Sequence, residues 1–532
     1  MASALFSFID SIGETFEGVV ENVETVVGNV EKEVDSAVQQ IDAGVDLDDV
    51  LEEIELAGTD ETAFLAACKR LEGLAQSQTA TILHGWVVED RVVPVVCAAL
   101  CRVESAKLAA GPLARTLNGM GQALDSTGTT PEELRAFHEQ IVRRTENGKA
   151  MMKLLQAQGV ASRTQGLALL RRVYPETSSV LGRHLLSDPE SISALMQILQ
   201  DAKNNTTEVE EVALCAECVQ FLRLVTAKDS DVRMIVTFQD GVEALLAIAA
   251  HALSAGSSAG PASVTFLSLA TDACVCVLQL VGQGPVAQKY MREAGHLLAL
   301  IRSLRAVVMA AGLTEAGGAS WALGVRNVAT VLLEAVGSFV STAGIEAEQN
   351  SKALVQSTGF VELVCEVLQY HFDPLRLQAV QILTGAVRAA PEPSLGFFNA
   401  NIQGGSMLDF FVATVLGKMS TPLEVRAAIE VLLAAGLERS ADVRKALVSA
   451  LEAAQLEESP GASGAGMFLL AFRMADQRIQ GATQNACGSL DANTWFAARL
   501  LGQCIRSDVE LRQQLTRQLV GTRPKSSIPL DY

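Results

Sequence analysis

The stretch MREAGHLLALIRSL (291–304) decides the fold, because a short helical piece ends in it and a longer helix begins at its glycine. The same arrangement occurs earlier as FQDGVEALLAIAAHAL (238–253) and later as LVQSTGFVELVCEVL (354–368). Glycine accepts backbone angles that other residues resist, so it permits a sharp turn between two helices. The chain therefore repeats one structural unit, marked by Gly241, Gly295 and Gly359.

Long amphipathic segments lie between these stretches and complete a unit of three helices. Their apolar residues recur at helical spacing, and the segments are 207–226, 262–282, 324–340, 373–388 and 421–437. A long helix, a short helix and a glycine-started helix follow in order, as in an armadillo repeat. The glycines are further apart than the about 40–47 residues of such a repeat. The Gly/Ser/Ala-rich insertions 253–263 and 309–320, which fall in the same loop of successive units, account for the difference.

We predict an all-α fold, an armadillo/HEAT-like right-handed α-solenoid over residues 46–520, with a flexible tail at 521–532. Weaker units extend the array at 185–201, which lacks the glycine, and at 401–419, which has it. In the glycine-started helices we expect six apolar residues to face the neighbouring repeats, namely Leu245, Leu246, Leu298, Leu300, Leu363 and Val364.

Composition and charge exclude several functional classes. The chain has 532 residues, of which 49% are hydrophobic and 5% aromatic, and its formal net charge is −20. Nucleic-acid binding needs a basic face, and the sequence offers none. No run of 18 or more apolar residues is present, so we expect no membrane span. The N-terminus lacks the pattern of a secretory signal peptide, so we expect an intracellular protein.

The first 45 residues predict an acidic amphipathic helix. Eight apolar residues follow one another at alternating spacings of four and three, namely Leu5, Ile9, Ile12, Phe16, Val19, Val23, Val26 and Val30. Three interpretations remain open: a cap on the solenoid, self-association or binding to a partner helix, and contact with a membrane interface. Residues 1–62 carry 17 acidic side chains and a single base, Lys32. Anionic lipid would therefore repel this segment, and its acidity suits either a solvated helix face or a basic partner.

The sequence contains no catalytic motif, and we predict that the protein is not an enzyme. The serine-hydrolase, zinc-protease and phosphate-loop patterns are all missing, and the six histidines are dispersed. Ten cysteines lie in apolar helical runs. Cys215 and Cys218 form a CxxC pair, and Cys274 and Cys276 follow one unit later, but no knuckle-type glycine turn accompanies either pair. Core packing is the preferred interpretation, so we assign no catalytic, cofactor-binding or metal-binding residue and no cofactor.

Near the C-terminus, SLDANTWFAARLLGQCIRSDVELRQQLTRQL (489–519) departs from the simple repeat. A Ser/Asp turn leads to Trp495, a small-residue helix, a polar turn and a Gln/Leu helix. This block resembles the head domain of the general vesicular transport factor family, whose members are vesicle-tethering proteins. The resemblance extends through 231–248, 286–300 and 350–368, in the family's order and spacing. The resemblance covers about residues 150–520.

The resemblance implies a tether head that acts in ER-to-Golgi and intra-Golgi transport and lies in the cytoplasm and peripherally on Golgi and vesicle membranes. It implies recruitment by a Rab-type small GTPase, partners among SNARE or golgin proteins, and promotion of SNARE-dependent docking. Partner-contact residues are not carried over, and self-association into a homodimer stays open. The family continues into a coiled coil and an acidic tail, whereas this sequence ends at Tyr532. We therefore expect neither coiled-coil dimerisation nor tail-mediated golgin binding. The alternative function is an armadillo-type adaptor for linear peptide segments in another pathway.

Overall fold

The computed structural model describes residues 46–444 and five single residues near the C-terminus, 502, 506, 509, 512 and 513. Short stretches within 46–444 lie outside the description, namely 58–59, 90, 103–108, 158, 205–208, 258–262, 314–318, 342–343, 358, 370–371, 391–394, 403, 416–420 and 441–442. The predicted N-terminal helix (1–45), the block around Trp495 and the tail (521–532) lie outside the described residues as well. Their predictions stay predictions.

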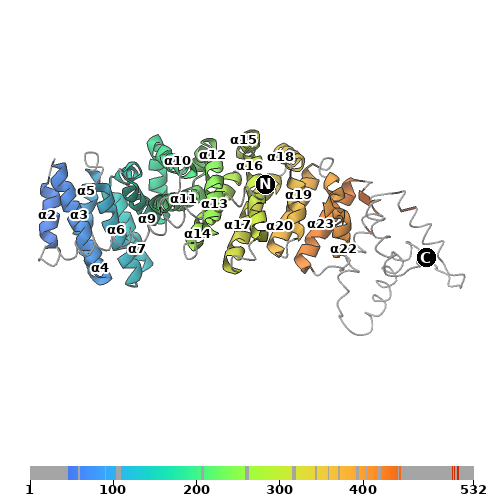
Figure 1. The fold of residues 1–532 in the computed structure, drawn as a ribbon. Coiled ribbons are helices and arrows are strands. Elements are labelled where there is room, and N and C mark those ends of the chain that lie inside the picture. Colours follow the sequence, from blue (N-terminus) through green and yellow to red (C-terminus); the bar gives the residue numbers. More distant parts are fainter. Residues whose placement is uncertain are drawn as a thin grey trace, which may run out of the picture. The chain divides into compact units, whose positions relative to one another are not determined.

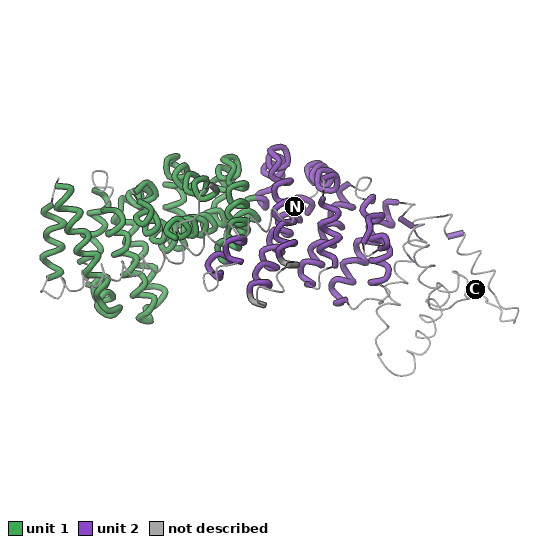
Figure 2. Tube along the Cα trace, viewed as in Figure 1, with its two compact units in different colours: residues 1–252, 268–280 green, residues 253–267, 281–532 purple. Residues whose placement is uncertain are grey.

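The chain forms two compact units, coloured in Figure 2. Unit 1 comprises residues 1–252 and 268–280, and unit 2 comprises residues 253–267 and 281–532. The helices of unit 1 are α2 (Leu47–Leu56), α3 (Glu61–Ser77), α4 (Ala80–Val88), α5 (Val92–Cys101), α6 (Ala110–Ser126), α7 (Pro131–Arg144), α8 (Lys149–Met152), η2 (Lys153–Gln156), α9 (Val160–Ser187), α10 (Pro189–Asn204), α11 (Val209–Lys228) and α12 (Ser230–Phe238). The boundary between the units runs through α13 (Gly241–Gly256) and α14 (Ser263–Val281).

Unit 2 continues the same helical pattern (Figure 1). Its helices are α15 (Pro285–Glu293), α16 (His296–Leu313), α17 (Ala319–Ser341), α18 (Ile345–Gln356), α19 (Phe360–Gln369), α20 (Asp373–Ala389), η5 (Leu395–Asn399), α22 (Met407–Val415) and α23 (Leu423–Arg439). One small antiparallel hairpin, β1 (Asn401–Ile402) with β2 (Gly405–Ser406), pairs Asn401 with Ser406 and Ile402 with Gly405. The described residues confirm the predicted all-α repeat fold, while the handedness of the array stays a prediction.

The long helices of successive repeats pack against one another within each unit. In unit 1, α3 packs on α6, α6 on α9 and α9 on α11. In unit 2, α17 packs on α20 and α20 on α23, while the short helices α15 and α18 pack together. The apolar face of each long helix is buried against the long helix of the next repeat. A single repeat therefore cannot bury its apolar residues alone. The two predicted insertions follow equivalent helices, α13 and α16, but each is in part helical, since residues 253–256 end α13 and residues 309–313 end α16.

All three predicted turns are present, but glycine makes only two of them. Gly295 (φ 84°) and Gly359 (φ 90°) adopt left-handed backbone angles, and their carbonyl oxygens accept the first hydrogen bonds of α16 and α19. In the first stretch the left-handed residue is Asp240 (φ 58°), and its carbonyl oxygen accepts the equivalent bond from the Ala244 N–H. Gly241 is instead the first residue of α13. The expectation that Gly241 makes the turn is therefore wrong by one residue.

The short helix of each three-helix repeat begins at a second fixed position, which sequence reasoning missed. The N-cap residues of α12, α15 and α18 are Asp229, Gly284 and Gly344, and their carbonyl oxygens accept the helix's first hydrogen bond. Gly284 (φ 114°) and Gly344 (φ 117°) occupy a region that is almost exclusive to glycine. Asp229 caps α12 with its carboxylate, which accepts bonds from the Asp231 and Val232 N–H groups. The turn before the short helix is thus formed by an Asp side-chain cap in one repeat and by a glycine in the two that follow.

The two weaker units predicted at 185–201 and 401–419 begin their helices in different ways. The unit at 185–201 forms α10 without a glycine, because Asp188 caps the helix through the Glu190 N–H and the Ser191 hydroxyl. In the unit at 401–419 the prediction of a glycine-started helix is wrong. Gly404 (φ 84°) and Gly405 lie in the β1–β2 hairpin, and α22 begins after Ser406, which exchanges hydrogen bonds with Asp409.

Five of the six apolar residues expected to face neighbouring repeats are buried. Leu298 is the exception, at 43% exposure, because its neighbour Leu297 occupies the inward position on α16.

Two helices, α14 (Ser263–Val281) and the Trp321–Ser341 part of α17, are long and apolar enough to cross a membrane by length and composition. The sequence prediction concerned an unbroken run of 18 apolar residues, and neither helix contains one, since Asp272 interrupts α14 and Arg326 and Glu334 interrupt α17. The expectation of no membrane span stays a prediction. Half of each segment is buried against other helices. In α14, Asp272 forms an ion pair with Arg223 of α11, a contact that belongs to a helix packed in a protein core. Core helices of soluble proteins meet the same length and composition criteria, so the finding is weak evidence for a span.

Candidate protein-interaction grooves

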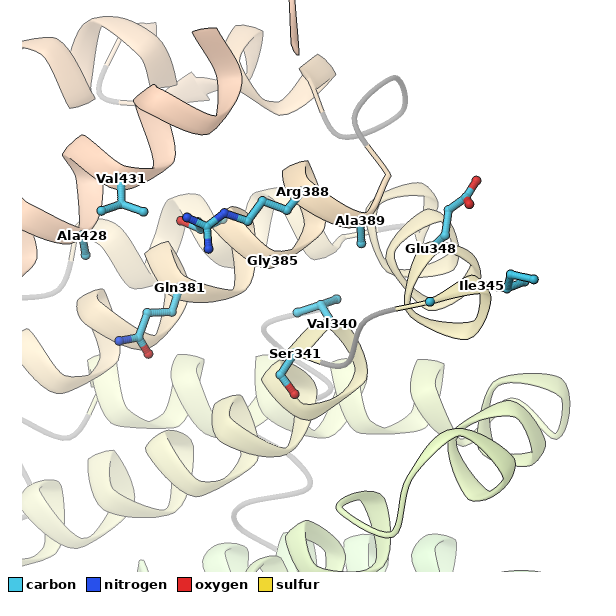
Figure 3. A pocket seen from close by; sticks show the side chains of 12 residues that line it. Val340, Ser341, Ile345, Glu348, Gln381, Gly385, Arg388, Ala389, Ala428 and Val431 are labelled. Carbon is cyan, nitrogen blue, oxygen red and sulfur yellow. The ribbon is translucent and has the colours of Figure 1, made fainter. Parts of the chain in front are cut away.

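An open groove lies in unit 2, where the end of α17 and the start of α18 meet α20 and α23. We call it the unit 2 groove, and its volume is about 860 Å³, within the range of pockets that hold ligands. Figure 3 shows the side chains around it. Its main lining residues are Val340 on α17, Ile345 and Glu348 on α18, Arg388 on α20, and Ala428 and Val431 on α23.

Two glycines shape the unit 2 groove. Gly385 allows α20 to pack closely on α17, since a Cβ there would lie 3.0 Å from Val340 Cγ2 and 3.1 Å from the Val340 carbonyl oxygen. Gly344, the N-cap of α18, has no heavy atom within 4 Å of the place where a Cβ would be. The missing side chains bring the two long helices together at one point and leave open space beside α18.

The walls of the unit 2 groove combine apolar residues with the polar side chains of Ser341, Gln381 and Thr384, and they carry one uncompensated charge. Ile345 is 72% exposed and Val431 is 41% exposed. Glu348 lies 2.6 Å from Lys352 Nζ, so that pair is neutral as a whole. Arg388 is exposed and has no ion-pair partner among the residues that the structure describes. The groove therefore has a net positive charge in a chain whose net charge is −20.

A second groove lies in unit 1 between α3, α4, α6 and α9, with a volume of about 550 Å³. We call it the amide groove, because five carboxamide side chains line it: Gln76, Gln78, Asn118, Gln122 and Gln165. Asn118 donates to the Gln165 carbonyl oxygen (3.0 Å), which joins α6 to α9. Its two charged residues, Glu72 and Arg115, are paired at 2.9 Å. Burial raises the pKa of Glu72, and Arg115 partly offsets that rise.

Ion pairs join the long helices of unit 1 in sequence along the chain. Arg172 of α9 bonds Asp125 of α6 (2.5 Å), and Arg171 of α9 bonds Glu217 of α11 (2.7 Å). Arg223 of α11 bonds Asp272 of α14 (2.5 Å). Burial raises the pKa of Asp272, and the attraction of Arg223 opposes it. These pairs neutralise the charges between helices, so they serve packing and register more than recognition.

The cysteines behave as core residues, as the sequence pattern favours. Cys215, Cys218, Cys274 and Cys276 are all buried, and none forms a disulfide. The Cys218 thiol lies 3.7 Å from the Leu195 carbonyl oxygen, and burial raises the pKa of Cys215 and of Cys274 to about 12. No group of three or more metal-binding side chains occurs within the described part of the chain. The thiols lie where they fill space between helices.

The histidines are not gathered into a catalytic arrangement within the described residues. His138 and His296 are buried, and each lies beside an aromatic ring, Phe137 and Tyr290 respectively. His84, His184 and His251 are partly or fully exposed on three different helices, α4, α9 and α13, and His371 lies outside the described residues.

Sequence reasoning named no partner-binding residue and missed the unit 2 groove. A signal was present in GPVAQ (284–288) and GIEAE (344–348), where a glycine N-cap is followed at once by apolar residues at the start of a short helix. Val286 and Ile345, from these two places, are both strongly exposed. An apolar residue in the first turn of a helix, next to a glycine, therefore marks exposed apolar surface in these repeats.

Comparison with known proteins gives a similarity of fold. No family model matches the sequence, and no curated protein matches it. Two crystal structures of yeast Uso1, a vesicle tethering factor, are similar in structure. One (Uso1-2) aligns at 14% identity with a TM-score of 0.57, covering 77% of this chain and 64% of that chain. The other (Uso1-1) aligns at 13% identity with a TM-score of 0.56, covering 80% and 66%.

This chain thus spans just under two thirds of the length of those Uso1 chains. At such low identity the likeness establishes shared architecture and leaves activity open. The protein is an all-α helical-repeat protein that shares the fold of Uso1.

Proposed function

We propose that this protein is a non-catalytic scaffold of the vesicle-tethering kind, acting in ER-to-Golgi and intra-Golgi transport. One observation carries the proposal: the fold of a vesicle tethering factor extends over 77–80% of the chain. Helical-repeat proteins bind partners over extended surfaces, and the two open grooves agree with such a role. The dispersed histidines and the buried thiols also favour binding over catalysis.

Recruitment by a GTP-loaded Rab-type GTPase, contact with SNARE or golgin proteins and promotion of SNARE-dependent docking belong to this proposal. So does a peripheral position on Golgi and vesicle membranes from the cytoplasmic side. These statements rest on the sequence resemblance around Trp495 and along the repeats, together with the shared fold.

The test is capture of Rab proteins on the immobilised full chain. A panel of Golgi-associated Rab proteins is loaded with a non-hydrolysable GTP analogue or with GDP, and the GDP form of each is the matched control. Selective capture of at least one GTP-loaded member supports the proposal. Equal capture in both nucleotide states, or capture of none, contradicts recruitment by a Rab protein.

The second candidate function is an adaptor for linear peptides, and the amide groove favours it. Carboxamides both donate and accept hydrogen bonds, so they can satisfy the main-chain groups of an extended peptide. The test is selection of random peptides by the full chain and by a Gln122→Leu/Gln165→Leu variant. Loss of the selected peptides in that variant, with retention in a Gln378→Leu control in unit 2, supports this function. Equal binding to the double variant contradicts it.

A further inference from the structure

The unit 2 groove has the apolar part of a binding site. Val340 and Ala428 form its walls beside the exposed Ile345 and Val431. Burying an exposed aliphatic side chain under a partner is favourable, because apolar surface is removed from water. Single exposed apolar residues are ordinary on protein surfaces, but here Ile345 and Val431 lie at opposite ends of one open groove of about 860 Å³ (Figure 3). An apolar side chain of a partner would therefore be stabilised in it.

The charge in the groove selects among partners. Figure 3 shows the Arg388 side chain extending from α20 toward the α23 side, where Ala428 and Val431 lie, while Glu348 and Ile345 of α18 both point away from the other lining side chains. Glu348 is compensated by Lys352, so the guanidinium of Arg388 is the uncompensated charge at the cavity. A guanidinium beside apolar walls binds a carboxylate in a two-pronged, charge-assisted geometry. A basic partner would be repelled at the same place.

We infer that the unit 2 groove binds an acidic peptide segment of a partner protein, with an apolar side chain in the cavity and a neighbouring Asp or Glu on Arg388. The apolar residue supplies most of the affinity, and the carboxylate supplies the choice of partner. This inference goes beyond the proposed function and does not depend on Rab binding. It also differs from the amide groove of unit 1, whose two charges are already paired.

The experiment selects random peptides displayed on phage with the full-length chain, after depletion on an Arg388→Glu chain. The depletion removes every peptide that binds elsewhere on the protein, including the amide groove. We expect the remaining peptides to share an apolar residue next to Asp or Glu. In fluorescence anisotropy, Arg388→Glu should weaken their binding by about tenfold or more, since it replaces an attraction by a repulsion.

Matched variants separate the two parts of the site. Val431→Ser removes apolar surface beside Arg388 and should weaken the same peptides several-fold, whereas Ile345→Ser, at the other end of the groove, should weaken them less. Arg439→Glu reverses an exposed charge on α23 outside the groove and should leave affinity unchanged. All four substituted side chains are exposed, so the circular dichroism spectrum and melting temperature should match those of the unmodified chain.

Three outcomes overturn the inference. The first is that no peptide survives depletion, and the second is that the survivors lack acidic residues. The third is that the groove is an interface between two copies of this chain, seen as self-association that Arg388→Glu abolishes. Rab capture can fail while this site binds peptides, and peptide binding can fail while Rab capture succeeds, so the two experiments distinguish the two proposals.

Discussion

Glycines at neighbouring places in the repeats serve two different purposes. Gly295 has a left-handed backbone (φ 84°) and no heavy atom within 4 Å of the place where a Cβ would be, so a substitution there meets only backbone strain. Gly241 has an ordinary φ, but a Cβ would lie 2.5 Å from Val236 Cγ1 and 2.7 Å from the Val236 carbonyl oxygen. One glycine is needed for its angles and the other for its small size.

This difference makes the first prediction. Gly295→Ala should destabilise the fold by about 1–2 kcal/mol, and Gly295→Asn by less, because Asn tolerates the left-handed region. At Gly241 the order should reverse, with Asn worse than Ala, because the obstacle there is space. Thermal unfolding of the four variants measures both orders. Gly85→Ala in α4, where neither strain nor contact arises, is the control and should be neutral or stabilising by up to about 1 kcal/mol. Equal effects of Ala and Asn at both sites would refute the distinction.

His138 makes the second prediction, on pH dependence. The ring is 4% exposed, neither nitrogen has a hydrogen-bond partner among the described residues, and burial lowers the pKa of His138 from 6.5 to about 4, with nearby Arg172 adding to the effect. The unfolded chain takes up the proton near pH 6.5 and the folded chain only near pH 4. The contribution of the neutral His138 ring to the free energy of unfolding is therefore fully present above pH 6.5, and it is lost as the pH falls from 6.5 to 4.

The expected slope in that window is at most about 1.4 kcal/mol per pH unit from this one group. His138→Leu should flatten the dependence of the unfolding free energy on pH between 6.5 and 4, while leaving the value at pH 8 less affected. Urea titrations at several pH values measure it, with His184→Leu on α9 as the control. An unchanged slope in His138→Leu would show that other groups govern acid stability.

At the scale of elements, a buried polar network joins the short helices α15 and α18 to α17. Gln288 donates to the Ser338 carbonyl oxygen (2.9 Å), and Asn350 donates to the Phe339 carbonyl oxygen (3.2 Å) and to Gln288 Oε1 (3.3 Å). Gln288 and Asn350 are 1% and 0% exposed. The two amides thus satisfy main-chain groups near the end of a long helix and tie adjacent repeats together.

The third prediction concerns this pair. Gln288→Leu or Asn350→Leu alone leaves buried partners without a hydrogen bond and should cost about 1–3 kcal/mol. The double variant should cost less than the sum of the single ones, because the two amides bond each other. A double-mutant cycle by thermal or urea unfolding gives the coupling energy. Strict additivity would mean that the contact between the two amides contributes nothing.

At the scale of the whole molecule, the thiols report on the integrity of both units. Seven of the eight cysteines that the structure describes are buried, and Cys101 alone among them is partly exposed. Burial raises the pKa of the buried thiols, for example that of Cys68 and of Cys97 to about 12. The thiolate is the reactive form, so these groups should be inert while the units stay folded.

The fourth prediction follows from that burial. Iodoacetamide at pH 8, followed by peptide mass mapping, should modify Cys101 before the other seven described cysteines. Those seven should react only after urea unfolds their unit, and the order of their appearance should separate unit 1 from unit 2. Cys487 and Cys504 lie outside the described residues and are scored separately. Fast modification of Cys215 or Cys218 in the native protein would contradict the packing described above.

The helical repeat was predictable because it depends on local patterns. Apolar spacing decides which segments are helices, and Gly295 and Gly359 mark turns through their own backbone freedom. The same reasoning misplaced the turn at Gly241, because Asp tolerates a left-handed angle and no sequence rule separates Asp240 from its neighbour. The same reasoning also predicted a helix start at Gly404 and Gly405, where the structure has a hairpin, because glycine pairs occur in both kinds of turn.

The sequence by itself determined an acidic, all-α chain of three-helix repeats with buried cysteines and a resemblance to vesicle tethers. Tertiary structure alone decided which charges are paired and which apolar residues stay exposed. Arg223 and Arg388 are both arginines on long amphipathic helices, yet one meets Asp272 on a neighbouring helix and the other faces an open groove. The physical reason is that pairing and exposure depend on which helices become neighbours, and that depends on packing between segments distant in the chain.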